Sequence, residues 1–127
     1  MNPRDSARSV AIARIVFGAA FMLAPGLTGR IWIGREATQP PVKVLTAAIG
    51  ARDLAMGIGV LMAMSRGKPA RGWLEGIALT DVLDFTMGLL GRDRLPTANR
   101  RIVLALAGGS ALQAATAAAG VDDDVQS

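Results

Sequence analysis

Five ionisable side chains lie near the middle of long apolar stretches of this 127-residue chain: Arg14, Arg52, Asp53, Asp81 and Asp84. Charges at the centre of a membrane helix are costly, so they usually pair with one another or serve a function. Two kinds of chemistry suit this set. The charges could form interhelical ion pairs that hold helices in register, or a carboxylate among them could carry a proton or bind a polar head group. The residue types leave both interpretations open.

The amino-acid composition removes most catalytic chemistry. The chain has no Cys, His or Tyr. It therefore lacks a thiolate nucleophile, a Cys- or His-based metal site and the commonest general base. No recognisable arrangement of a nucleophile with a base is present. We expect a non-enzymatic protein that carries no cofactor and no metal.

The apolar stretch around Arg52 and Asp53 needs partners elsewhere in the chain. Insertion scales put the cost of two such charges at about 5–7 kcal/mol, whereas the Leu, Ile and Val residues of this stretch return only about 2–4 kcal/mol. Arg14 is one available partner. Asp81 and Asp84 are two more, and because they are three residues apart they share one helix face. The five residues are therefore predicted to form one intramembrane charge cluster.

Four hydroxyl and amide side chains are candidates for the lining of this cluster. Thr80 lies next to Asp81 in the sequence. Ser110, Gln113 and Thr116 are spaced so that they share one face of the last apolar stretch. We expect these residues to point inward, where they could form hydrogen bonds with the charges.

Breaks rich in Pro and Gly divide the chain into four helices of about 20 residues. The predicted ranges are 6–24, 42–64, 71–90 and 100–120, and residues 121–127 are predicted to form a disordered acidic tail. A helix of this length spans roughly 30 Å, the hydrocarbon thickness of a bilayer. We predict a single all-α domain over residues 1–127, an integral membrane four-helix up-down bundle.

A water-soluble helical bundle is the alternative, and it requires a polar face on each helix. The segment 54–64 contains no polar side chain, and 102–120 contains only three. The net charge of +4 comes from basic residues that flank the apolar stretches, where they would meet lipid head groups. The expected partner is therefore the lipid bilayer, and nucleic acid is not expected.

Two stripes of small residues recur every four positions, and such stripes let membrane helices pack closely. Packing within one bundle is the simpler interpretation, and homo-oligomerisation through one stripe is the alternative. The stripes consist of Ala47, Ala51, Ala55 and Gly59 in the second predicted helix and of Ala107, Ala111, Ala115 and Ala119 in the fourth.

The segment Gly50–Gly59 reads Gly-Ala-Arg-Asp-Leu-Ala-Met-Gly-Ile-Gly. It resembles a family of small bacterial four-helix membrane proteins of unknown function that share Gly-Ala-Arg-Asp-Leu-Ala-x-Gly in the second helix. The resemblance extends to Arg14 before Phe17-Gly18, to Ala24-Pro25 and to Asp81-x-x-Asp84, and it covers most of residues 8–120. It implies a membrane protein and implies no activity.

Together these features predict a multi-pass protein of the bacterial inner membrane. The 12 Arg against 2 Lys agree with a GC-rich genome. The expected role is that of a non-enzymatic membrane component with a buried Arg/Asp cluster. The alternative is a transporter-like or proton-relay protein that uses its intramembrane aspartates.

Overall fold

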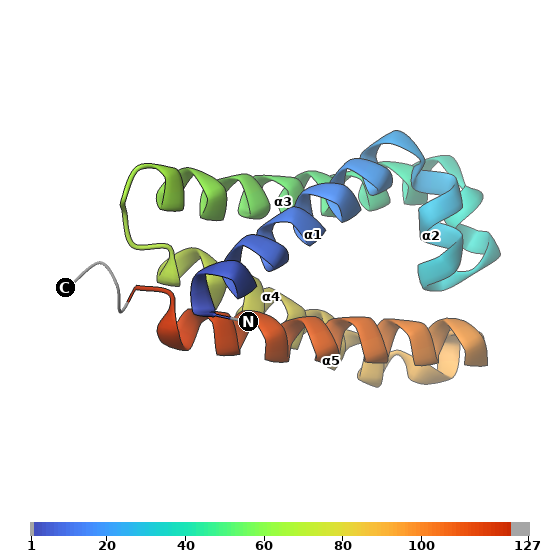
Figure 1. Ribbon diagram of the computed structural model, residues 1–127. Coiled ribbons are helices and arrows are strands. Elements are labelled where there is room, and N and C mark those ends of the chain that lie inside the picture. The colour runs from blue at the N-terminus through green and yellow to red at the C-terminus, as the bar shows by residue number, and fades with distance from the viewer. Residues whose placement is uncertain (1, 123–127) are drawn as a thin grey trace.

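The computed structural model describes residues 2–122 and is helical throughout (Figure 1). The described residues contain five α-helices, two short 3-10 helices and no strand, so the predicted all-α class is confirmed. In chain order the elements are α1 (Pro3–Leu23), α2 (Pro25–Ile33), η1 (Arg35–Thr38), α3 (Pro40–Ser65), α4 (Arg71–Leu90), η2 (Arg92–Arg94) and α5 (Thr97–Gly120). The four long helices lie within three residues of the predicted ranges.

Proline begins three of the helices, because the first helical turn does not need the N–H that proline lacks. Pro3 begins α1, Pro25 begins α2 and Pro40 begins α3. At the start of α1, the Asn2 side chain also accepts a hydrogen bond of 2.8 Å from the backbone N–H of Asp5. The prolines and the Asn2 cap therefore mark the residues at which these helices begin.

The helix α2 corrects the sequence analysis, which placed residues 25–41 in a loop. Pro25 both ends α1 and begins a new nine-residue helix. The end of α2 is held by the Asn99 amide, which donates to the carbonyl oxygens of Arg30 at 2.8 Å and Ile31 at 2.7 Å. The chain then turns at Gly34, whose φ of +88° favours glycine.

The long helices are arranged as two pairs, α1 with α3 and α4 with α5 (Figure 1). Consecutive long helices run in opposite directions. The helix α1 meets α5 near the chain termini and lies away from it at the other end, where α2 packs against both α3 and α5. The two pairs therefore diverge toward α2.

Glycines bring α1 and α3 into backbone contact. A β-carbon on Gly18 would lie 2.5 Å from the Gly50 carbonyl oxygen, and one on Gly57 would lie 2.6 Å from the Ala11 carbonyl oxygen. Only glycine allows so close an approach.

These contacts differ from the small-residue stripes that the sequence suggested. In α3, Ala47 is half-buried and Ala51 and Ala55 are exposed, while Gly59 packs against the Trp73 ring. In α5, Ala107 is buried and Ala111 half-buried, and both Ala115 and Ala119 are exposed. The stripes thus contribute only part of their length to packing within the chain.

Three helices are long and apolar enough to cross a membrane: α1, α3 and α5. They present large apolar side chains outward, including Leu23, Val44 and Leu112. These features support a membrane protein. The helix α4 is not among the candidates, because Glu75, Asp81 and Asp84 add charge to its apolar sequence.

A packed apolar core fills the half of the molecule that holds the termini. Its members come from the four long helices, from Ala70 just before α4 and from Val121, and those in the helices include Ala7, Val10, Val60, Leu74, Ile77, Ala114 and Ala118. The two Asp122 carboxylate oxygens accept hydrogen bonds from the backbone N–H groups of Ala70 at 3.0 Å and Arg71 at 3.3 Å. Val121 and Asp122 are therefore ordered, contrary to the predicted tail, whose remaining residues 123–127 lie outside the described part.

Candidate functional site

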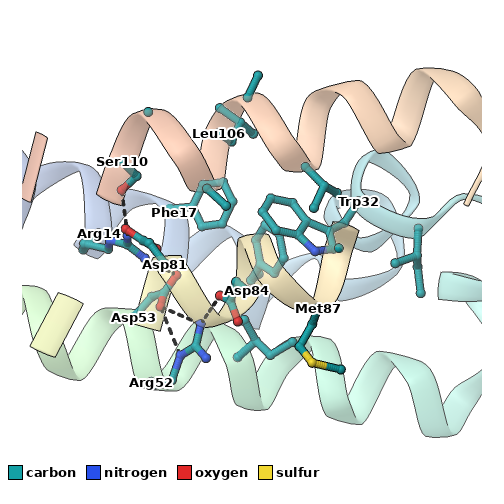
Figure 2. Close-up of a pocket in the computed structure, with 18 of the residues that line it drawn as sticks. Arg14, Phe17, Trp32, Arg52, Asp53, Asp81, Asp84, Met87, Leu106 and Ser110 are labelled. Atoms are coloured by element: carbon teal, nitrogen blue, oxygen red, sulfur yellow. Dashed lines mark hydrogen bonds and ion pairs between the residues drawn. The ribbon is translucent and has the colours of Figure 1, made fainter. Parts of the chain in front are cut away.

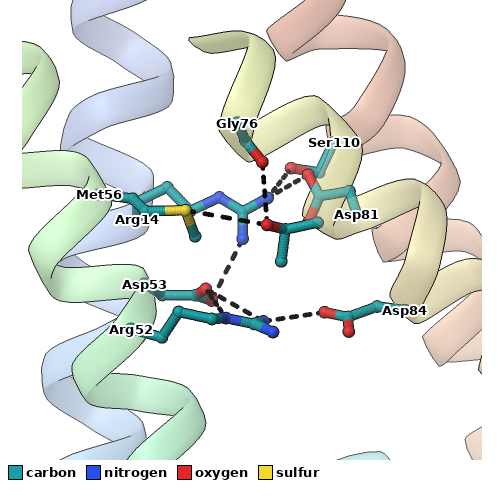
Figure 3. Close-up of polar contacts among 9 residues, drawn as sticks. Arg14, Arg52, Asp53, Met56, Gly76, Asp81, Asp84 and Ser110 are labelled. Carbon is teal, nitrogen blue, oxygen red and sulfur yellow. Dashed lines mark hydrogen bonds and ion pairs between the residues drawn. The ribbon is translucent and has the colours of Figure 1, made fainter. Parts of the chain in front are cut away.

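The five central charges form one continuous chain of ion pairs (Figure 3). Arg14 pairs through Nη1 with Asp53 Oδ2 at 3.2 Å and through Nη2 with Asp81 Oδ2. Arg52 Nη2 lies 3.3 Å from Asp53 Oδ1 and 2.9 Å from Asp84 Oδ2. The charges alternate in the order Asp81, Arg14, Asp53, Arg52, Asp84, with a carboxylate at each end. We call these five residues the charge network.

Three helices supply the charge network. Arg14 comes from α1, Arg52 and Asp53 from α3, and Asp81 and Asp84 from α4. Arg14, Asp53 and Asp81 are 8%, 2% and 3% exposed, whereas the side chains of Arg52 and Asp84 are 38% and 34% exposed. The network therefore runs from a buried end at Asp81 to an accessible end at Asp84.

Of the four predicted lining residues, only Ser110 contacts the charge network. Its hydroxyl oxygen accepts a hydrogen bond of 2.7 Å from Arg14 Nη2. Thr80 donates to the Gly76 carbonyl at 2.9 Å and also lies 3.9 Å from the sulfur of Met56. Thr80 thus forms no hydrogen bond with the charge network, since a threonine hydroxyl within a helix can bond to a carbonyl of the preceding turn.

The other two candidates, Gln113 and Thr116, are exposed side chains of α5. Thr116 is exposed and donates to the Gln113 carbonyl at 2.9 Å, so it takes no part in the site. Gln113 is exposed as well, although it lines the cavity described next. Within the part of the chain that the structure describes, no buried polar side-chain atom lacks a hydrogen-bond partner.

A cavity of about 650 Å³ opens from the charge network between the two diverging helix pairs (Figure 2). The charge network and Ser110 form its polar end. Its walls are apolar and include Phe17, Phe21 and Trp32. The Phe17 and Phe21 rings are stacked with centroids 4.4 Å apart, and the Trp32 ring meets both edge-on at 6.1 and 6.2 Å. We call these three residues the aromatic wall.

The cavity extends from the charge network toward α2 and the turn between α4 and α5. Its lining extends to Ile33 at the end of α2 and to Arg94 and Leu95 after α4. On the opposite side of the network lies the packed core, where Val60, Leu74 and Ile77 are 0% exposed. On the side of the packed core the cavity is therefore closed, and we call it the blind cavity.

The sequence analysis missed the aromatic wall. Arg14, Phe17 and Phe21 recur at helical spacing, which indicates a shared face and could have extended the candidate site. Trp32 could not be placed in the same way because α2 was not foreseen. The volume and the apolar walls with few polar groups are typical of small-molecule sites.

The arrangement suits binding better than bond-making chemistry. Each carboxylate of the charge network already faces a guanidinium. Among residues 2–122, no group of three or more His, Cys, Asp or Glu side chains is placed to hold a metal ion. A ligand's polar group could meet the exposed end of the network while its apolar part lies along the aromatic wall.

Comparison with protein-family models finds no match, and comparisons with curated proteins and with solved structures find none either. The resemblance of Gly50–Gly59 to a family of small bacterial membrane proteins therefore stays a prediction. The function must be inferred from the site itself.

Proposed function

We propose that this chain is a non-enzymatic integral membrane protein that binds an amphipathic small molecule in the blind cavity. The polar group of the ligand would lie at the Arg52–Asp84 end of the charge network, and its apolar part along the aromatic wall. The observation that carries this proposal is the direct junction of buried charges with an apolar cavity of about 650 Å³. Intramembrane charges that serve only to join helices do not need such a cavity beside them.

We further propose that α4 crosses the bilayer, so that the chain makes four passes of the bacterial inner membrane as an up-down bundle. The outward residues Leu79, Val82, Leu83 and Leu90 are apolar and exposed. Asp81 is buried and Asp84 faces the cavity, so neither charge would meet lipid tails. A helix can cross a membrane when its charges turn inward and are paired.

Single-cysteine labelling tests the four-pass arrangement, and the chain has no native cysteine to remove. Lys68→Cys lies between α3 and α4, Asp93→Cys between α4 and α5, and Glu36→Cys between α2 and α3. An impermeant maleimide should label positions 36 and 93 from one side of the membrane and position 68 from the other. Labelling of positions 68 and 93 from the same side would overturn the proposal for α4.

Trp32 allows binding to be measured directly. The chain has two tryptophans, so Trp73→Phe leaves Trp32, in the aromatic wall, as the only indole. Protein in phosphatidylcholine nanodiscs would be titrated with twelve-carbon amphiphiles that carry cationic, neutral or anionic head groups. A saturable change in Trp32 emission with at least one head group is expected, and its absence with all of them would overturn the proposal.

A matched pair of glycine variants shows whether the signal arises in the cavity. Gly109 lines the cavity and a β-carbon there would meet no atom within 4 Å, so Gly109→Leu should fit and occupy part of the space. Gly76 has equal room but lies outside the cavity. Gly109→Leu should weaken binding of every amphiphile, and Gly76→Leu should leave it unchanged.

A transporter-like or proton-relay function is the second candidate. The unbroken series of ion pairs from exposed Asp84 to buried Asp81 favours it. A path through the membrane would also require the core around Val60, Leu74 and Ile77 to open. Proton flux into liposomes that is lost in Asp84→Asn and Asp81→Asn would support this candidate, and flux no greater than in empty liposomes would exclude it.

A further inference from the structure

We infer that the ligand of the blind cavity is a hydrophobic cation, an amine or ammonium group attached to an apolar body. This inference rests on the proposed binding function and adds the charge of the ligand. It follows from the order of charges in the network, from the exposure of its outer end and from the aromatic rings that line the same cavity.

The charge network lacks one positive charge. It contains the two guanidinium groups of Arg14 and Arg52 and the three carboxylates of Asp53, Asp81 and Asp84. Each arginine lies between two carboxylates, and both ends of the series are therefore negative. A cation beside one of the ends would continue the alternation and balance the charge.

Asp84 is the end that a ligand can reach. The other end, Asp81, is 3% exposed and lies against Arg14, with the packed core beyond it. The Asp84 side chain is 34% exposed and lines the cavity. Only its Oδ2 is paired, with Arg52 at 2.9 Å, and within residues 2–122 its Oδ1 accepts no hydrogen bond. Oδ1 is therefore available to an N–H donor of a ligand.

The aromatic wall favours a cation over other polar groups. Asp84 lines the same cavity as the three aromatic rings, and in the view of Figure 2 its carboxylate lies between Arg52 and Trp32. The faces of aromatic rings attract ammonium groups, and Trp attracts them most strongly. The same rings offer apolar surface to the body of the ligand. One carboxylate and three rings in the same cavity thus match both parts of a hydrophobic cation.

Arg94 is the remaining charge of the cavity lining, and it favours an anion. It is exposed, belongs to η2 at the far end of the cavity from the network's buried end, and forms no ion pair with the described residues. A long arginine side chain at a membrane surface can extend toward the aqueous side. An anionic ligand drawn to Arg94 is therefore the competing outcome of the test.

Three probes of equal chain length separate the possibilities: dodecylamine, dodecanol and dodecanoate. Their dissociation constants would be measured from Trp32 emission in the Trp73→Phe protein, in phosphatidylcholine nanodiscs at neutral pH. Dodecylamine should bind about tenfold more tightly than dodecanol, the effect of one favourable charged contact. Repeating the titration in discs that contain phosphatidylethanolamine tells whether a lipid amine competes with the free amine for the site.

Variants of Asp84 assign the preference to one carboxylate. Asp84→Asn should weaken dodecylamine binding about tenfold and leave dodecanol binding unchanged, and Asp84→Glu should retain the preference for the amine. Asp93→Asn, an exposed aspartate outside the cavity, is the matched control and should have no effect. Because each probe partitions to the same extent into nanodiscs of one composition whichever variant they hold, the ratio of its dissociation constants between variants reports the cavity alone.

The outcomes distinguish this inference from the proposed function. Tighter binding of dodecanoate than of dodecylamine, or an unchanged amine affinity in folded Asp84→Asn, would overturn the cationic assignment and leave the binding function standing. Saturable binding by none of the three probes would overturn the binding function itself.

Discussion

Arg14 of α1 and Asp81 of α4 form a buried ion pair across 67 residues of sequence, although each of their helices packs chiefly against a different partner. The contact joins the α1–α3 pair to the α4–α5 pair at the level where the two pairs begin to diverge. Arg14 also holds Asp53 of α3 and Ser110 of α5, so its guanidinium contacts all three of the other long helices.

Removing the Arg14 guanidinium should be the most damaging single change. Arg14→Met leaves Asp53 and Asp81 buried without their main partner, and breaking a buried pair in this way typically costs about 3–5 kcal/mol. Thermal unfolding in detergent would measure the loss. Arg52→Met should cost less, because its side chain is 38% exposed and Asp84 can be solvated.

The same ion pair makes the effects of two substitutions non-additive. In Arg14→Met with Asp81→Asn, the unpaired carboxylate that the first change creates at Asp81 is neutralised by the second. The double variant should therefore lose less unfolding free energy than the sum of the two single losses, by about 0.5–3 kcal/mol. Strict additivity would mean that Arg14 and Asp81 do not interact in solution.

The glycine contacts between α1 and α3 should not tolerate a methyl group. Gly18→Ala and Gly50→Ala would each place a β-carbon about 2.5–2.6 Å from backbone atoms of the facing helix, so we expect a loss of roughly 1–3 kcal/mol. Gly76→Ala is the matched control, because open space surrounds Gly76 and alanine favours a helix. If Gly18→Ala were as stable as Gly76→Ala, the close approach would be wrong.

The contact between Asp122 and the start of α4 should contribute measurably to stability. Asp122→Ala removes the acceptor for the backbone N–H groups of Ala70 and Arg71, and loss of such a cap costs about 0.5–2 kcal/mol. Thermal unfolding against Asp93→Ala, an exposed aspartate near the opposite end of α4, provides the comparison. Equal melting temperatures for the two variants would contradict the cap.

Asn99 should control how firmly α2 holds the aromatic wall. Asn99→Ala removes two hydrogen bonds to the end of α2, worth about 0.5–1.5 kcal/mol each. The resulting motion of α2 should expose Trp32 to a water-soluble quencher in the Trp73→Phe protein. Thr97→Ala, in the same turn of α5 but without a side-chain hydrogen bond to α2, should leave quenching unchanged.

The amino-acid sequence predicted the long helices and the members of the charge network for one physical reason. Charges within apolar helices must find partners, and Arg14, Asp53 and Asp81 lie at matching positions along theirs. The network could thus be proposed before any contact was known. The accessible end at Asp84 could not, because exposure depends on how far the helix pairs diverge.

What the sequence did not reveal depends on contacts between distant segments. Pro25-Gly26 indicates that a helix ends, but it does not indicate whether another helix begins at the same place. The helix α2 and the position of Trp32 were therefore missed. Thr80 and Thr116 form no hydrogen bond with the charges because carbonyls of their own helices accept from the hydroxyl groups. Asp122 was assigned to a tail because its partners, Ala70 and Arg71, lie about 50 residues away in the chain.

The packed core around Leu74 and Ile77 closes one end of the cavity. In the four-pass arrangement that we propose, a bound molecule would have no route through this core to the other side of the membrane. The occupancy of the cavity would then not be driven by a concentration gradient across the bilayer. Such a protein would work as a receptor or a reservoir, and its output would be the fraction of time that the cavity is filled.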